Sequence, residues 1–171
     1  MKRLSALSRQ MRLLRTVSRL KPRQIAYQFL RRLRPKTRVS APAGIVLRAG
    51  LRLAPPLPRS CGGEPWAFTF LNERKEFDPA RFDWVSRDRD KLWRYNLHYF
   101  DYLHEPGRAN GPELVDGWIA ANPQGREDAW EPFPVSLRLV NWIKFCLSPG
   151  APTPLPPSWA ESLGLQARWL A

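Results

Sequence analysis

Tyrosines recur on one face of an aromatic-rich segment, LWRYNLHYFDYLHE at 92–105. Tyr95, Tyr99 and Tyr102 follow one another at steps of four and three with Asn96 beside them, as on one face of a helix. Flat rings that carry hydroxyls, together with an amide, suit stacking on sugar rings and hydrogen bonding to their OH groups. The same pattern fits amphipathic tyrosines packed between helices with their hydroxyls at the rim. Both interpretations stay open.

A lone histidine lies on the polar face of this segment. His98 stands three residues before Asp101, one helical turn away, so the two side chains could form a pair. Arg94, Asp101 and Glu105 lie on the same polar face, and we interpret His98 as a structural histidine that is held by a partner.

The segment WEPFPVSLRLVNWIKFCL at 130–147 is predicted to be a buried helix, because it is apolar around most of its circumference. Arg138 and Asn141 nevertheless lie one turn apart within it, and Glu131 just precedes it. A buried guanidinium is costly unless it is paired. Either Glu131 or another carboxylate pairs Arg138, or Arg138 faces a cleft and binds an anionic ligand bidentately.

The periodicity of apolar residues predicts a mainly α fold around these segments. We expect helices near residues 2–20, 22–34, 90–104, 112–121, 134–147 and 158–170, and short strands at Ile45–Leu53 and Ala67–Phe70. Prolines at 22, 112 and 134 suit first helical positions. Three parts follow: a basic amphipathic helical arm at 1–38, an irregular proline-rich segment at 39–91, and a helical region at 92–171.

Charge is distributed unevenly over the 171 residues. Residues 1–38 hold 13 of the 28 Lys and Arg and none of the 15 Asp and Glu, so residues 39–171 have no net charge. A basic amphipathic arm predicts an anionic partner, such as a membrane surface, or a docking surface on the protein itself. The neutral remainder and the lack of a nucleic-acid-binding motif argue against a nucleic acid partner.

Several other classes of function are not supported by the sequence. It contains no apolar run of about 18 residues that would predict a transmembrane helix, and the recurring N-terminal arginines leave no apolar stretch for a secretory signal. Cys61 and Cys146 are far apart with no CxxC motif, so we expect neither a metal site nor a dithiol site. No glycine-rich phosphate loop is found, and no cofactor is expected.

Four stretches together resemble the N-terminal domain of the heparinase II/III family of polysaccharide lyases. They are LWRYNLHYFDYL at 92–103, the W-I-x-x-NP stretch at 118–123, WEPFPVSLRLVNWIKF at 130–145 and L-x-x-QARWL at 163–170. LKPRQIAYQFLRRLR at 20–34 and FLNERKEF at 70–77 resemble the segment that leads into that domain, so the resemblance covers about residues 17–171.

The resemblance implies a partial α/α toroid and a function in cleaving acidic, uronate-containing polysaccharides by β-elimination. Such substrates include glycosaminoglycans and alginate-like polymers. Neutralising the uronate carboxylate acidifies the C5 proton, which a Tyr or His then removes. The family's catalytic Asn, His and Tyr segment and its β-sandwich would follow the 163–170 stretch. No catalytic residue is therefore carried over, and the chain alone is expected to be inactive.

The resemblance implies that this chain forms part of the wall of a substrate cleft. The candidate substrate-binding residues are Tyr99, Trp130, Arg138 and Asn141. The partners that the resemblance implies are an acidic polysaccharide and the missing toroid helices and β-sandwich domain. It suggests a bacterial cell envelope or periplasm, while the compartment stays open. Two alternatives are a non-catalytic carbohydrate-binding or scaffold module and a membrane-surface binder that acts through residues 1–38.

Overall fold

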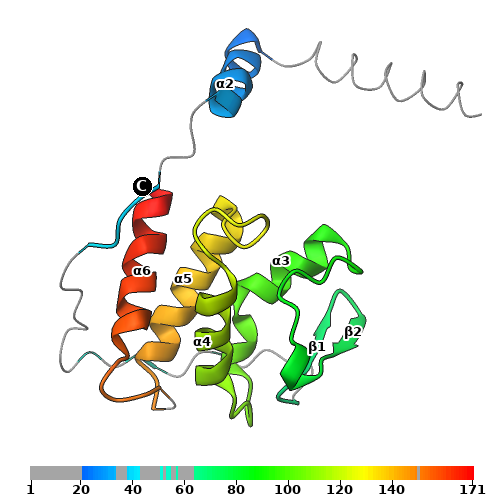
Figure 1. Ribbon diagram of the computed structural model, residues 1–171, viewed down its shortest axis with the longest axis vertical. Coiled ribbons are helices and arrows are strands. Elements are labelled where there is room, and N and C mark those ends of the chain that lie inside the picture. Colours follow the sequence, from blue (N-terminus) through cyan, green and yellow to red (C-terminus); the bar gives the residue numbers. More distant parts are fainter. Residues whose placement is uncertain are drawn as a thin grey trace, which may run out of the picture. The chain divides into compact units, whose positions relative to one another are not determined.

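A computed structural model describes residues 21–33, 38–42, 51, 53, 54, 57, 64–149 and 151–171. The predicted helix at 2–20 and most of the predicted strand at Ile45–Leu53 lie outside these residues. The chain divides into two compact units, Met1–Thr37 and Arg38–Ala171. In the first unit, α2 spans Pro22–Leu33 (Figure 1), and the side chain of Gln24 accepts a hydrogen bond from the backbone N–H of Lys21. This confirms the predicted helix and its start at proline.

A β-hairpin opens the well-described part of the second unit. Strand β1 (Ala67–Phe70) pairs antiparallel with β2 (Glu73–Glu76), with Phe70 opposite Glu73. The turn residues Leu71 and Asn72 have φ values of 54° and 62°, a left-handed pair that matches the twist of a two-residue hairpin. The sequence predicted β1 but not β2, because all four residues of β2 are charged and carry no apolar alternation.

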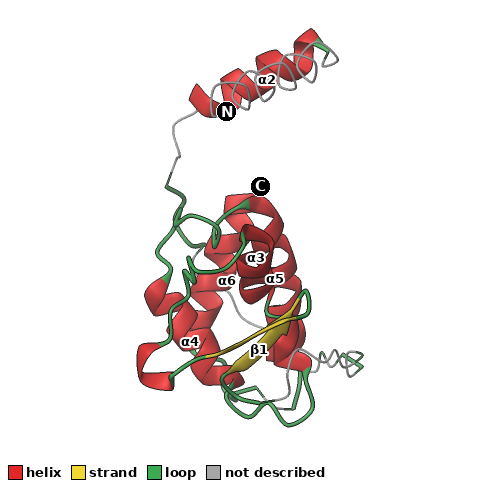
Figure 2. Ribbon diagram, turned by 90° about the vertical axis from the view of Figure 1, so that its right-hand side faces the viewer, coloured by secondary structure: helices red, strands yellow, loops and turns green. Residues whose placement is uncertain are grey.

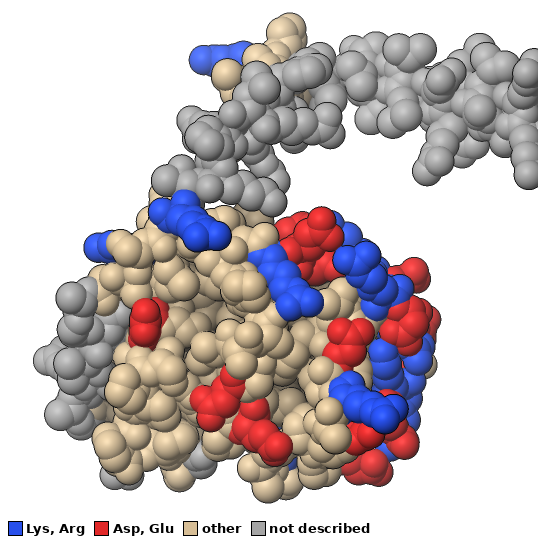
Figure 3. Space-filling view, in the orientation of Figure 1, with Lys and Arg blue, Asp and Glu red and all other residues tan. Residues whose placement is uncertain are grey.

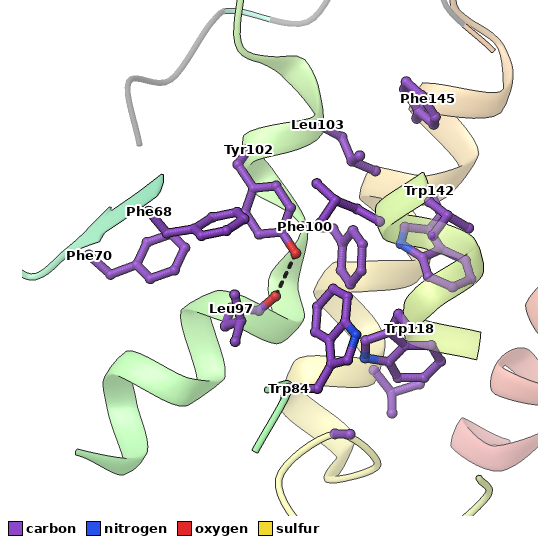
Figure 4. Packing of buried hydrophobic residues seen from close by; sticks show 14 of the residues in the cluster. Phe68, Phe70, Trp84, Leu97, Phe100, Tyr102, Leu103, Trp118, Trp142 and Phe145 are labelled. Carbon is purple, nitrogen blue, oxygen red and sulfur yellow. Dashed lines mark hydrogen bonds between the residues drawn. The ribbon is translucent and has the colours of Figure 1, made fainter. Parts of the chain in front are cut away.

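The predicted helix at 90–104 is two elements, and this prediction was wrong. Helix α3 (Lys91–Tyr99) ends at Phe100, which has φ 63°, and a 3-10 helix η2 (Asp101–His104) follows. The left-handed backbone turns the fully buried Phe100 ring into the core, against Trp84 and Trp142 (Figure 4). Tyr102 is thereby moved off the face of Tyr95 and Tyr99, so the predicted tyrosine stripe is broken.

Three longer helices complete this unit, close to the predicted ranges: α4 (Gly111–Ala121), α5 (Pro132–Cys146) and α6 (Pro157–Leu170). Helix α5 packs against α3 and against α6, while α4 packs against α6 (Figures 1 and 2). Each of the three has a proline in its first turn, where no hydrogen bond is lost. The fold is therefore mainly α, with one two-stranded sheet in the described residues.

The core between these elements is unusually rich in indole rings. Trp93, Trp118, Trp142 and Trp159 are each 1% exposed, and the rings of Trp118 and Trp142 meet edge to face with centroids 5.3 Å apart (Figure 4). Offset and edge-to-face contacts of this kind stabilise a core beyond the area they bury. None of the described helices combines the length and apolar character needed to cross a membrane.

A buried ion pair fixes the hairpin to the helices. Arg108 and Glu105 lie 2.5 Å apart with side chains that are essentially inaccessible to solvent. Arg108 also donates to the carbonyls of Pro65 and Ala67 and lies 4.8 Å from the Phe68 ring centroid. Because the pair is surrounded by these further acceptors, its burial is compensated. Lysine, arginine and acidic side chains are interspersed on the surface over the hairpin and α3 (Figure 3).

Candidate functional site

A polar pocket of about 470 Å³ lies where α3 meets the turn at 84–87 and the loop at 122–128. We call it the arginine pocket. Its lining includes Trp84, Arg87, Arg94, His98, Arg126 and Asp128. With Glu127, the lining carries three arginines and two carboxylates, which leaves one positive charge in excess.

A tight turn positions the residues on one side of the pocket. The Asp83 carboxylate accepts hydrogen bonds from the backbone N–H groups of Val85 and Ser86, and the Ser86 hydroxyl donates to the Asp83 carbonyl. Side chains such as Asp commonly build turns by bonding their own backbone in this way. Trp84 is thereby held against Phe100, with ring centroids 5.5 Å apart and planes inclined by 18°.

The opposite side of the pocket is built around Arg94. Its Nε donates to Asp128 Oδ2 at 2.6 Å, and its Nη1 donates to the carbonyl of Arg89 at 2.7 Å. Asp128 has φ 58°, so a left-handed residue brings this carboxylate to α3. Arg126, on the same loop, has an exposed side chain and donates to the carbonyl of Ala121. The site therefore combines Arg94, which is held and neutralised by Asp128, with the solvent-accessible Arg87 and Arg126.

His98 lies at the inner end of the pocket and is 2% exposed. Its Nδ1 accepts a hydrogen bond from Trp118 Nε1 at 3.1 Å, so the predicted pairing with Asp101 is wrong. Asp101 instead accepts from Asn141 Nδ2 at 2.7 Å. Burial, reinforced by the charges of Arg138, Arg126 and Arg94, lowers the pKa of His98 to about 3. The imidazole is consequently neutral over the physiological range.

Arg138 is fully buried and has neither of the two roles that the sequence left open. Its Nε donates to Gln166 Oε1 at 2.7 Å and its Nη1 to the carbonyl of His98 at 3.2 Å. The guanidinium carbon lies 3.8 Å from a Trp118 ring centroid, a cation–π contact. Glu131, the expected partner, bonds instead with Lys91 and Tyr95. With no exposed surface, Arg138 belongs to the interior and not to a ligand-facing cleft wall.

Asn141 joins α5 to the break after α3. Its Nδ2 donates to the carbonyl of Tyr99 at 2.8 Å and to Asp101, and the side chain is buried. It lines a second pocket of about 510 Å³, together with Asp101, His104 and Lys144. Asn141 is therefore separated from the arginine pocket, although it does border a cavity.

Tyr99 and Trp130 are also buried, at 6% and 4% exposed. The Tyr99 ring meets Phe133 edge to face, and its hydroxyl is buried with no hydrogen-bond partner among the described residues. Trp130 Nε1 donates to the carbonyl of Asn122 at 3.0 Å, behind the loop that lines the arginine pocket. The four predicted binding residues thus support the site or lie away from it. None lines the arginine pocket.

Sequence reasoning missed Trp84, Arg87, Arg94 and Arg126. A signal did exist for one pair, because Arg94 and His98 are four residues apart on the predicted polar face of the 92–105 segment. The other residues come from turns whose geometry depends on Asp83 and Asp128, and no periodic pattern marks them.

The chain matches no family model, no curated protein and no solved structure in the comparisons made. Within the ranges that the structure describes, no cluster of three His, Cys, Asp or Glu side chains is placed to hold a metal ion.

Proposed function

We propose that this chain is the N-terminal portion of a heparinase II/III-like polysaccharide lyase, and that its arginine pocket binds an acidic, uronate-containing polysaccharide. The observation that supports the proposal most is the lining of the pocket. Arginine side chains in net excess over carboxylates stand beside an indole ring, Trp84, and a neutral imidazole, His98.

This lining matches the chemistry of a uronate. Arginine offers planar, bidentate N–H donors that fit a carboxylate, and N–H donors also suit the hydroxyls of a sugar ring. The Trp84 ring is 5% exposed and stacks on Phe100, so it supports this lining from behind. The pocket volume falls within the range of about 300–1,000 Å³ that is usual for small-ligand sites. One excess positive charge is consistent with a ligand that carries one carboxylate per bound sugar.

The residues of the arginine pocket would bind the polysaccharide and would not carry out the elimination. In the resembled family the proton-abstracting groups follow the 163–170 stretch, so β-elimination would require that further segment. Helices α3 to α6 would then be the first helices of an incomplete α/α toroid. Supporting this, the stretches that carry the resemblance contribute Trp93, Trp118, Trp130 and Trp142 to one shared core.

Binding of trigalacturonate by calorimetry tests the proposal, with the neutral trisaccharide maltotriose as the comparison ligand. Arg126→Ala should weaken binding by about 10- to 100-fold, because a hydrogen bond to a charged group contributes about 1.5–3 kcal/mol. Arg81→Ala removes an exposed arginine of the 3-10 helix Pro79–Arg81, outside the pocket, and should leave binding unchanged.

Two results would contradict the proposal: equal affinity for the neutral trisaccharide, or equal losses in the two arginine variants. If acidic sugars bind, and the chain joined to a catalytic segment of the resembled family gives no ultraviolet-absorbing unsaturated product, the carbohydrate-binding module replaces the lyase as the function.

A further inference from the structure

Resting on the proposed function of the arginine pocket, we infer that His98 is a specificity-determining hydrogen-bond donor of that pocket and that Trp118 is the positioning residue that fixes its tautomer. The pocket would then select acidic sugars that present acceptor oxygens to Nε2. It would reject sugars that present a free ammonium there.

The tautomer follows from the direction of one hydrogen bond. An indole N–H can only donate, so Nδ1 of His98, at 3.1 Å from Trp118 Nε1, has to be the unprotonated nitrogen. In a neutral imidazole the hydrogen then resides on Nε2. Because His98 lines the arginine pocket, this N–H is the donor that the ring has available for a ligand.

The indole that directs the histidine is itself held by charge and by helix packing. The guanidinium of Arg138 lies over the Trp118 ring at 3.8 Å and also donates to the carbonyl of His98. Gln166 of α6 accepts from Arg138 Nε and donates to Ser162, which is buried as well. His98 is therefore fixed at its ring and at its backbone by residues from α4 and α5, which α6 supports.

The charges around His98 disfavour its protonation from several sides. Arg94 approaches from α3, Arg126 from the loop at 122–128, and Arg138 from α5. Arg87, Glu127 and Asp128 complete the charged groups of the pocket lining, and Asp128 is engaged by Arg94. Since the buried ring also loses hydration, the neutral donor persists well below neutral pH.

The donor sets a chemical requirement for the ligand. Nε2–H and the arginine N–H groups can only donate, so the oxygens that face them must accept hydrogen bonds. A carboxylate, a sulfate ester, an acetamido carbonyl or a hydroxyl meets this requirement. An ammonium group that faces these donors does not, because it has no acceptor lone pair and would be repelled by the arginines.

Nitrogen-15 histidine spectra of the full 171-residue chain test the tautomer directly. Only two histidines are present, and His104→Gln assigns the signals. We expect His98 to show an unprotonated Nδ1 and a protonated Nε2, unchanged from about pH 8 to about pH 5, since the pKa of His98 is about 3. Addition of trigalacturonate should shift the Nε2 signal while the tautomer is kept.

Trp118→Phe removes the donor and keeps an aromatic ring. The variant should show a mixture of tautomers and bind trigalacturonate about five- to tenfold more weakly, as expected for one misdirected hydrogen bond. Trp159→Phe is the matched control, because it also removes a buried indole donor, to Asp116 Oδ1 at 2.6 Å, but away from the pocket. It should change neither the His98 signals nor the affinity.

The ligand requirement is tested with hyaluronan oligosaccharides and their de-N-acetylated forms, of which only the acetylated forms should bind. A wild-type His98 that is protonated on Nδ1, or that titrates near pH 6.5, overturns the inference even if Trp118→Phe fails to fold. Equal affinity of a folded Trp118→Phe variant also overturns it, while the proposed function stands. If no acidic oligosaccharide binds, the proposed function fails together with the donor's role, and the spectra still decide the tautomer.

Discussion

At the scale of single residues, Arg138 shows how a charge is kept in the interior without a carboxylate as a hydrogen-bond partner. The sequence left an interior ion pair and a cleft-facing side chain open for it, and the structure buries it completely, although the outer face of α5 exposes Val140 and Ile143. The partners were not predictable, since Gln166, the His98 carbonyl and the Trp118 ring come from three other helices. Burial lowers the pKa of Arg138, and the compensation comes from amide acceptors and an aromatic face.

Replacing Arg138 with Met should destabilise the protein by about 2–4 kcal/mol. The substitution leaves the buried acceptors Gln166 Oε1 and His98 O without a donor, at about 1–3 kcal/mol each, and relief of the desolvated charge offsets part of this. Urea unfolding measures the change, with the exposed Arg81→Met as the control. A variant as stable as the wild type would contradict this, because the cost of desolvating the guanidinium would then equal the stabilisation from its hydrogen bonds.

His98 should make stability depend on pH in one direction. Its pKa is lowered from 6.5 to about 3 in the folded state, so between these values the unfolded chain binds a proton that the folded chain does not. Stability from this group is therefore complete above about pH 6.5 and is lost as pH falls toward 3, by up to about 4–5 kcal/mol. Urea midpoints of the wild type should fall more steeply with acid than those of His98→Gln. Parallel curves would contradict this.

At the scale of elements, apolar periodicity predicted α4, α5 and α6 well, because each has apolar residues at helical spacing and a proline in its first turn. It failed at Phe100, since the left-handed residue is fixed by its ring entering the core, which is a tertiary effect. It also missed β2, which exists through pairing with β1 and not through its own side chains.

The start of α4 offers a sharp test of this packing. A Cβ added at Gly111 would lie 2.7 Å from the Phe145 ring, so Gly111→Ala should destabilise the protein by about 1–3 kcal/mol. Gly117 lies in the same helix, and its added Cβ would meet only Trp84 Nε1 at 3.8 Å. Gly117→Ala should instead stabilise by about 0.5–1 kcal/mol through helix propensity. Thermal unfolding measures the change in stability of both variants. A change of the same sign in both would contradict the packing argument.

At the scale of the whole molecule, the sequence predicted the class of fold better than the residues that line the arginine pocket. Its candidate residues, Tyr99, Trp130, Arg138 and Asn141, are aromatic or polar side chains in or next to α3 and α5, and the fold buries all four. The pocket is made by turns and by one helix face, which come together only when residues 84–87, 94–98 and 122–128 meet. Residues that build a site from loops leave little periodic signal in the sequence.

The most direct test of the central claim is a titration of the isotopically labelled chain with trigalacturonate, followed by backbone and side-chain nuclear magnetic resonance. If the arginine pocket binds acidic sugars, shift changes will concentrate at residues 84–87, at Arg94 and His98, and at residues 122–128, and maltotriose will cause none. Changes centred instead on the exposed ring of Phe133 beside Tyr99, or equal changes with the neutral sugar, would contradict it.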